Sequence, residues 1–355
     1  MTTFTHTMLR AFLWSGSLCL VACESGTPDP SPSVEPAAAP DVNDGGDVED
    51  AGVVGDAGVV AEGWHTLQAL PVARQETACV VHDGEVWVVG GYGASPGAQM
   101  VDTVHIYNPD DDSWREGPRL PEPLHHAQVA AVGDDVLVLG YLVSGFRPSG
   151  NAYKLNAAGT GWDPIASMPA GAERGAGIAV VLDDEVWVVG GFQYPAAIAS
   201  VWRYQPNDDT WVAGPALPEA LDHLVAGVVD GRIVTAGGRA VSIGAHNPHT
   251  FVLNADKTAW LRDDDMPTSR AGAAAAVLDD MLVVFGGEGA PNATGVFNNV
   301  EGFTLDDGWM SFEPMAVPRH GFCAAALPNS IFLPGGADVE AFAAIDHVDH
   351  WVPPQ

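Results

Sequence analysis

Short apolar runs that end in glycine recur along the chain at a spacing of about 49 residues. The heptapeptide Glu-Val-Trp-Val-Val-Gly-Gly occurs at 85–91 and again at 185–191, and related runs lie at 136–140, 233–238, 281–287 and 331–336. These runs are short, rich in β-branched residues and bounded by turn residues. The pattern predicts buried strands rather than helices.

Each of these runs belongs to a longer unit that predicts four antiparallel strands. A strand of small residues precedes the run, as at 77–82, and an acidic turn such as Asp83-Gly84 joins the two, which is a strong hairpin signal. A third strand follows, as at 104–109, and a tryptophan opens the fourth. The tryptophans that mark this position are Trp64, Trp114, Trp162, Trp211, Trp260 and Trp309.

Self-similarity at a period near 50 residues indicates a repeat architecture in which stacked sheets bury a common core. The glycine pairs that keep this period are Gly90-Gly91, Gly190-Gly191, Gly237-Gly238, Gly286-Gly287 and Gly335-Gly336, and the second repeat has Gly140-Tyr141 instead. Together with the aromatic third strand and the tryptophan, these markers resemble the kelch family over residues 64–355. The resemblance implies an all-β, six-bladed kelch-type β-propeller with four-stranded antiparallel blades, occupying residues 63–355.

The two ends of the repeat region predict how the ring closes. Residues 348–353 match the third-strand pattern, and no fourth strand follows them. Residues 64–67 form a fourth strand that has no preceding partners. We therefore expect the N-terminal strand to complete the last blade, which leaves only short protected sheet edges.

The first sixty residues predict export and anchoring. Residues 8–22 are apolar apart from Arg10, a run too short to span a bilayer and typical of a signal peptide. Leu20-Val21-Ala22-Cys23 resembles the lipobox of bacterial lipoproteins, which implies that residues 1–23 are a signal and that Cys23 is lipidated. The alternative is an ordinary cleaved signal. Residues 24–62, rich in Pro, Asp, Gly and Ala, predict a disordered linker.

This organisation places the protein in the bacterial cell envelope, as a lipoprotein of the outer membrane, on its periplasmic face or at the cell surface. The formal net charge is −32, which argues against nucleic acid and against docking on anionic lipid except through the anchor. Cys79 and Cys323 fall on innermost strands of the first and last blades. They are candidates for a disulfide, with two buried free thiols as the alternative.

The strand order places the fourth-to-first and second-to-third connections at the same end of the ring. The second-to-third loops are the longest, and long loops on a rigid scaffold concentrate binding residues. Arginines begin four innermost strands and two more lie in long loops. We expect ligand contacts from Arg74, Arg174, Arg270, Arg319, Arg147 and Arg239, unless the first four instead tie neighbouring blades through backbone carbonyls.

Aromatic and imidazole side chains at the same end complete the predicted binding surface, namely Tyr92, Tyr194, His126 and His223. No catalytic motif is present, and no histidine or cysteine spacing predicts a metal or another cofactor. We therefore expect a monomeric binding module for a protein or an anionic glycan. The alternative is a carbohydrate-active enzyme, because sialic-acid mutarotases are also exported kelch propellers with an anionic substrate.

Overall fold

The computed structural model describes residues 61–94, 98–240 and 244–354. These residues form 29 strands and no helix, and they include no helix that could span a bilayer. The predicted signal, Cys23 and most of the linker lie outside the described residues. The described residues belong to one compact unit.

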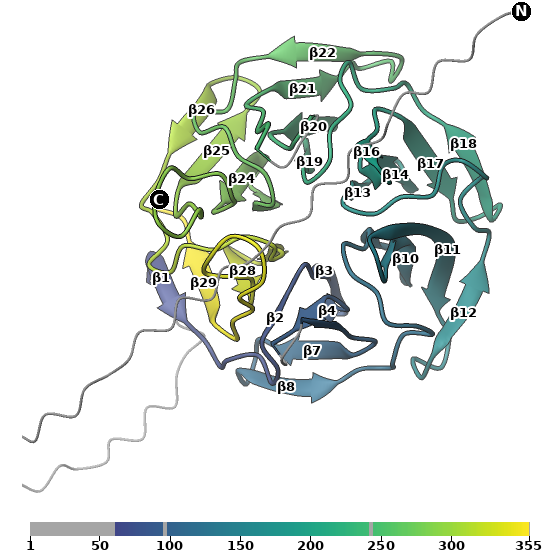
Figure 1. Ribbon diagram of the computed structural model, residues 1–355, viewed down its shortest axis with the longest axis horizontal. Helices are drawn as coiled ribbons and strands as arrows, with labels where there is room; N and C mark the ends of the chain where they lie inside the picture. Colours follow the sequence, from purple (N-terminus) through teal and green to yellow (C-terminus); the bar gives the residue numbers. More distant parts are fainter. Residues whose placement is uncertain (1–60, 95–97, 241–243, 355) are drawn as a thin grey trace, which may run out of the picture. The chain divides into compact units, whose positions relative to one another are not determined.

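Six four-stranded antiparallel sheets form a ring around a central axis, as Figure 1 shows. We number the sheets 1 to 6 from β3 onwards along the chain. In each sheet the chain runs outward from the axis, so that the first strand is innermost. The strand orders are β3-β4-β7-β8, β9-β10-β11-β12, β13-β14-β17-β18, β19-β20-β21-β22, β23-β24-β25-β26 and β27-β28-β29-β1.

The strands are short, as expected from the turn residues that bound them. The innermost strands are β3 (Ala78–His82), β9 (Val129–Val132), β13 (Ile178–Leu182), β19 (Val225–Val229), β23 (Ala274–Leu278) and β27 (Ala325–Leu327). The second strands are β4 (Glu85–Val89), β10 (Asp135–Val143), β14 (Glu185–Val189), β20 (Arg232–Ala236), β24 (Met281–Phe285) and β28 (Ser330–Pro334). The third strands are β7 (Val104–Asn108), β11 (Arg147–Leu155), β17 (Val201–Gln205), β21 (Thr250–Leu253), β25 (Val300–Thr304) and β29 (Val348–Val352). The outermost strands are β8 (Ser113–Glu116), β12 (Trp162–Ile165), β18 (Thr210–Ala213), β22 (Trp260–Asp263), β26 (Gly308–Ser311) and β1 (Gly63–Thr66).

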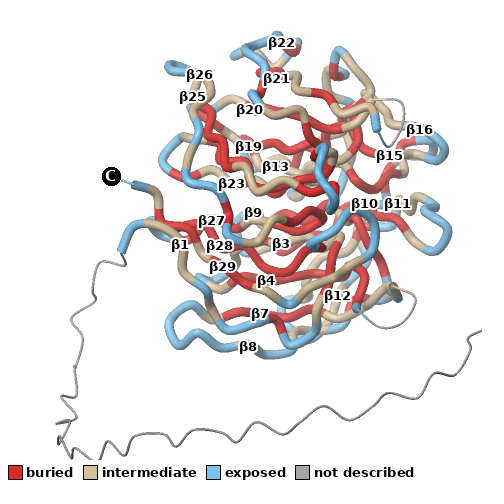
Figure 2. Tube along the Cα trace, turned by 60° about the vertical axis from the view of Figure 1, so that its left-hand side comes forward, coloured by how far each residue is buried: buried red, intermediate tan, exposed pale blue. Residues whose placement is uncertain are grey.

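Apolar clusters lie between neighbouring sheets, and the buried positions in Figure 2 follow the inner strands. The second strand of each sheet is the most buried because both of its faces pack, and Val86, Val88 and Val89 are fully covered. Sheets 6 and 1 share a cluster of the same kind, in which Tyr107 stacks on Phe332 with 4.5 Å between ring centroids. The ring is therefore closed by side-chain packing as well as by strand pairing.

The N-terminal strand completes the last sheet, as predicted. β1 pairs with β29 in antiparallel register, with Trp64 opposite Trp351. A disulfide joins Cys79 to Cys323 across sheets 1 and 6, with Cα atoms 5.7 Å apart. The sequence-based prediction of this disulfide is confirmed, and 244 residues separate its two cysteines.

The periodic tryptophans connect each sheet to the previous one. Trp114 Nε1 donates to the carbonyl of Gln68 at 3.0 Å, and Trp211 Nε1 donates to that of Ala166 at 2.7 Å. The other four marker tryptophans make the same bond, each to a carbonyl that follows the neighbouring outer strand. An indole both covers apolar surface and donates one hydrogen bond, which explains why this position repeats.

The periodic glycine pairs make a second set of links between sheets. The second glycine of each pair donates to a carbonyl at the start of the next sheet, as Gly287 N does to Arg319 O at 2.9 Å. Gly287 has φ +114°, and a Cβ on Gly286 would lie 2.3 Å from the same carbonyl. In sheet 2, Tyr141 replaces the second glycine. There β10 continues to Val143, so the predicted loop at 141–150 is mostly a β-hairpin.

The fourth-to-first and second-to-third connections do share one end of the ring. Strand β2 (Arg74–Gln75) pairs with β5 (Tyr92–Gly93), which pairs with β6 (Gln99–Met100). Equivalent bridges join Asp222 to Arg239 and His320 to Ala337. A further small hairpin is formed by β15 (Phe192–Gln193) and β16 (Ala196–Ala197). We call this end the loop face.

Candidate functional site at the mouth of the central channel

The four arginines that begin innermost strands are buried in the sheets and do not reach the channel. Each has at most 1 % of its surface exposed. Arg174 donates to the carbonyls of Gly190 at 3.0 Å and Ser200 at 2.6 Å, both in its own sheet. Arg74 makes the same type of bonds in sheet 1, to Gly90 and Thr103.

In sheets 5 and 6 a buried carboxylate joins these bonds. Arg270 Nη1 lies 2.7 Å from Glu301 Oε2, and Arg319 Nη1 lies 2.9 Å from Asp349 Oδ2. The predicted ring of ligand-binding guanidinium groups formed by Arg74, Arg174, Arg270 and Arg319 is therefore wrong. Burial leaves these guanidinium groups no access to a ligand. Their side chains hold strands of one sheet together, whereas the backbone carbonyls of Arg74, Arg270 and Arg319 receive inter-sheet bonds from glycine.

A closed ring of backbone hydrogen bonds encircles the axis two residues beyond each of these positions. We call it the collar, and its six members are Glu76, His126, Ala176, His223, Gly272 and Gly321, one from each sheet. Each amide donates to the carbonyl of the collar residue in the preceding sheet, at 2.5 to 3.1 Å. All six have positive φ, between 52° and 61°. This conformation costs a residue with a Cβ about 1 kcal/mol, so four of the collar residues are held there against their preference.

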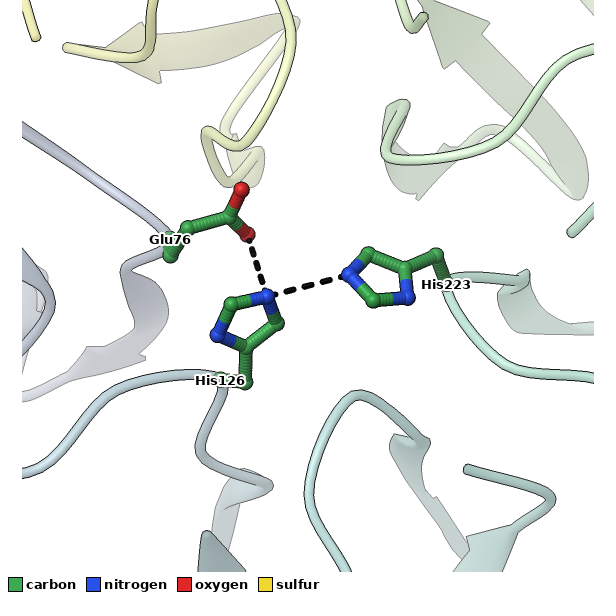
Figure 3. A group of neighbouring side chains, drawn as sticks. All are labelled: Glu76, His126 and His223. Atoms are coloured by element: carbon green, nitrogen blue, oxygen red, sulfur yellow. Dashed lines mark hydrogen bonds and ion pairs between the residues drawn. The ribbon is translucent and has the colours of Figure 1, made fainter. Parts of the chain in front are cut away.

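Three collar side chains meet over the channel, as Figure 3 shows. His126 Nε2 lies 3.0 Å from Glu76 Oε2 and 3.0 Å from His223 Nε2. One ligand-type atom from each residue falls within 4.8 Å of the other two. The three come from sheets 1, 2 and 4, so the ring closure itself brings them together.

Charged groups around His223 extend this cluster outward. His223 Nδ1 lies 2.6 Å from Asp222 Oδ1, and Arg239 contacts the same carboxylate oxygen through Nε at 3.0 Å. Arg239 Nη1 lies 2.7 Å from Glu288 Oε1, and its Nη2 lies 2.9 Å from His223 Nε2. The cluster therefore contains three carboxylates but a single guanidinium.

Aromatic residues continue the cluster on its other side. His125 Nδ1 is hydrogen-bonded to His126 Nδ1, and His125 Nε2 lies 2.9 Å from the Tyr92 hydroxyl. Tyr92 packs edge-on against Phe342, and Phe146 packs edge-on against His125. The loops of sheets 6, 1 and 2 thus share one continuous set of rings at the channel mouth.

Burial and nearby charges shift the pKa values of Glu76, His125, His223 and Tyr92 in this cluster. Burial raises the pKa of Glu76. The charge of His126, its hydrogen bond to Glu76, and the charges of His223 and His320 outweigh this effect and hold the pKa of Glu76 well below its usual value. Burial, aided by the positive charge of Arg239, lowers the pKa of His223. Burial likewise lowers the pKa of His125 to about 3, and burial with the charge of Glu76 raises the pKa of Tyr92 to about 12.

Two hollows adjoin the cluster. The central channel below the collar has a cavity of about 220 Å³ lined by small residues of all six innermost segments. A second hollow of about 260 Å³ lies on the loop face between Phe146, Phe192 and Arg239, and His223 lines both. A small ligand at the mouth would therefore contact the imidazole and carboxylate groups directly.

Comparison with known proteins agrees with the repeat pattern. The kelch-motif family model matches residues 73–121 and 179–218. The kelch-like protein terF of Aspergillus terreus is 28 % identical over 305 residues, which cover 81 % of this chain and 66 % of terF. This chain contains kelch motifs.

Other relatives and a solved structure are also similar to this chain. Kelch-like protein 35 of Mus musculus is 27 % identical over 72 % of this chain and 42 % of its own length. Kelch-like protein 23 of Homo sapiens is 26 % identical over 57 % and 35 %, respectively. The chain thus spans about a third to two thirds of these relatives. The structure of YjhT superimposes with a TM-score of 0.66 at 15 % identity, over 79 % of this chain and 95 % of YjhT. This likeness concerns the fold alone.

The kelch ring brings together four of the ten predicted binding residues. Tyr92, His126, His223 and Arg239 all belong to the cluster at the channel mouth. Arg147 is exposed and donates to the carbonyl of Ser144, and Tyr194 is 66 % exposed beside Phe192. These contacts of Arg147 and Tyr194 lie outside the cluster.

The sequence-based prediction missed Glu76 and Glu288, which supply two of the three carboxylates. A signal for Glu76 existed, because it stands at the same position of its repeat as His126 and His223. Alignment of the six repeats at their arginine or leucine positions places these residues in one register. The residue types at this position, one glutamate and two histidines, would have marked it as a candidate site, although no single residue repeats there.

Proposed function

We propose that the protein is an exported, lipid-anchored interaction module, a complete six-bladed kelch propeller whose loop face binds a protein or an anionic glycan. The support for a partner on this face is its exposed apolar surface. Large hydrophobic side chains are normally covered in a soluble domain, and clusters that remain exposed mark interaction sites. Several exposed large hydrophobic side chains lie on the loop face.

The observation that carries this proposal is the exposure of three aromatic residues in second-to-third loops. Tyr194 is 66 %, Phe342 54 % and Phe146 39 % exposed. Aromatic residues are enriched at the centre of protein interfaces. Arg239, the only guanidinium of the cluster, is already paired with Asp222 and Glu288. These contacts favour a protein partner over an anionic glycan.

Site-specific photo-crosslinking in the cells that make the protein tests this assignment. A benzophenone side chain placed at residue 342 or 146 should give discrete adducts of higher mass with partner proteins. The matched control is Leu261 on the outer strand β22, which is 53 % exposed but lies away from the loop face. Equal adducts from position 261, or none from either loop-face position, would contradict the proposal.

The lipid anchor rests on the sequence of residues 8–23, which lie outside the described residues. The disulfide between Cys79 and Cys323 supports an oxidising compartment outside the cytosol. Metabolic labelling with an alkyne-bearing fatty acid should label the wild-type protein, and Cys23→Ser should lose the label. Persistent labelling of this variant would contradict lipidation at Cys23.

A second candidate is a carbohydrate-active enzyme that resembles a sialic-acid mutarotase. The observation in its favour is the contact of an ionised carboxylate, Glu76, with the imidazole of His126 at the channel mouth. Opening and closing a sugar ring needs one group to donate a proton and another to accept one. Exchange NMR of N-acetylneuraminic acid should then show faster anomer interconversion with the wild-type protein than with Glu76→Gln. Identical rates with and without protein would exclude this activity.

A further inference from the structure

The strongest unassigned feature is the meeting of Glu76, His126 and His223 at the centre of the collar. Two imidazole nitrogens and one carboxylate oxygen point at a common space (Figure 3). Two of the three separations are 3.0 Å. A tetrahedral zinc site, with bonds of about 2.0–2.2 Å to nitrogen and oxygen, needs its ligand atoms about 3.3 Å apart. Lengthening these two separations by a few tenths of an ångström would reach that spacing, and the third pair of ligand atoms lies within 4.8 Å.

We propose that Glu76, His126 and His223 bind a divalent transition-metal ion of the Zn²⁺ type, with a fourth position open to the channel mouth. Two imidazoles and one carboxylate are a ligand set for borderline ions such as Zn²⁺ or Fe²⁺, whereas Ca²⁺ and Mg²⁺ prefer oxygen ligands alone. Three protein ligands are the number found where a metal binds a further molecule. This site revises the sequence-based expectation that no metal binds.

The neighbours of the two histidines orient both rings for this role. His223 Nδ1 lies 2.6 Å from Asp222 Oδ1, which favours a proton on Nδ1, whereas Arg239 Nη2 lies 2.6 Å from the same nitrogen and 2.9 Å from Nε2. His126 Nδ1 is hydrogen-bonded to His125, which in turn contacts Tyr92. Carboxylates and other acceptors behind a ligating imidazole fix its tautomer in this way and are typical of metal sites.

The backbone and the charge balance also fit a cation. The closed collar holds the three Cα positions through hydrogen bonds and does not depend on the ion, so the site is largely preformed. Glu76, Asp222 and Glu288 with Arg239 carry a surplus of two negative charges when the imidazoles are neutral. A divalent ion would neutralise this surplus.

Arg239 is the group that opposes the ion, because its Nη2 lies 2.9 Å from His223 Nε2. Its Nε and Nη1 are held by Asp222 and Glu288, so a metal ion would displace only this third contact. Removing the guanidinium should therefore tighten metal binding. A purely structural cluster, in which Arg239 only ties loops together, predicts no such gain.

Titration calorimetry of the full chain in detergent, with Zn²⁺ alone as the probe, tests the site. We expect one high-affinity equivalent and a rise in Tm upon addition of Zn²⁺. Glu76→Gln, His126→Ala and His223→Ala should each weaken binding by more than about 100-fold, and Asp222→Asn by about 10–100-fold. Arg239→Gln should tighten it. The Tm of each variant without metal establishes that it is folded.

The matched control is His65→Ala. His65 and His350 form another pair of histidines, with 4.9 Å between ring centroids, on the outer strands β1 and β29. This variant should keep the wild-type affinity and stoichiometry. The absence of a high-affinity equivalent in the wild type would overturn the proposal, as would its survival in a folded variant that lacks both His126 and His223. If all ligand variants fail to fold, the visible absorption of the Co²⁺-loaded wild type tests the proposal. A tetrahedral site gives an intense absorption, and a weak site on surface carboxylates does not.

Discussion

Two positions only two residues apart on the innermost segments behave in opposite ways. The first holds arginine in four of the six sheets, and these arginines are buried and bonded within their own sheet. The second is the collar position, where Glu76, His126 and His223 point into the channel but Ala176, Gly272 and Gly321 carry little or no side chain. The position that repeats holds the ring together. The position that varies carries the titratable side chains of the proposed site.

This difference follows from the symmetry of a repeat fold. A contact needed by every sheet selects the same residue repeatedly, as the tryptophans of all six sheets and the glycine pairs of five show. A ligand on the axis is a single object, so only some of the six collar side chains need to touch it. Within one chain, departure from the repeat at a channel-facing position is therefore a signal of function.

The largest expected effect comes from the repeated position. Arg319→Ala removes the guanidinium partner of the buried Asp349 carboxylate, so the free energy of unfolding should fall by about 3–5 kcal/mol. The exposed Arg147 is the control, and Arg147→Ala should change this value by less than about 0.5 kcal/mol. Urea unfolding followed by tryptophan fluorescence measures both. Similar losses for the two variants would remove the distinction between buried and exposed arginines.

Ring closure should give the next largest effect. Cys79→Ser removes a disulfide that closes a loop of 244 residues, so the unfolding free energy should fall by about 2–5 kcal/mol. The same loss should appear when the wild type is unfolded in the presence of a reductant. A reductant should leave the Cys79→Ser variant unchanged. An equal effect of reductant on both proteins would mean that the bond does not contribute.

Acidification should destabilise the protein through buried histidines. Burial, with the charge of Arg74, lowers the pKa of His105 to about 4, whereas an unfolded histidine titrates near 6.5. Between these values only the unfolded state is protonated, so stability is full above pH 6.5 and falls as the pH drops towards 4. His125 adds a similar contribution down to about pH 3. His105→Gln should reduce the slope by about 1.4 kcal/mol per pH unit, and an unchanged slope would contradict this assignment.

The smallest effect concerns the collar itself. Ala176 has φ +52°, so Ala176→Gly should relieve strain and raise the unfolding free energy by about 0.5–1 kcal/mol. Most alanine-to-glycine changes in a strand or loop destabilise, and Ala131→Gly in β9 provides that comparison. Thermal unfolding of the two variants should move in opposite directions. A loss of stability in both would mean that the collar geometry does not strain Ala176.

Periodicity predicts those parts of this molecule that every sheet shares. The strands, the glycine and tryptophan positions and the closing pair of β1 with β29 could be inferred because each depends on a repeated residue or on the two ends of the pattern. The disulfide was one of two alternatives, because the sequence placed both cysteines on innermost strands of adjacent sheets but left two buried free thiols open. The direction of a side chain does not follow from periodicity, and Arg174 was therefore placed at the channel mouth although it lies within its sheet.

The candidate site was only half predictable for a related reason. His126 and His223 were chosen for their residue type and their place on the loop face. Glu76 and Glu288 were not predicted, because acidic residues are common throughout a chain of net charge −32 and their residue type alone does not indicate a site. Their contacts join residues of different sheets, as between Arg239 and Glu288, which are 49 positions apart, and only the folded ring brings such residues together.

The most direct test of the claim that the varying collar residues carry the chemistry is anomalous diffraction at the zinc edge from crystals grown with Zn²⁺. The account predicts a dominant peak between Glu76, His126 and His223. A dominant peak at the acidic turns of the opposite end, or no peak inside the collar, would contradict it.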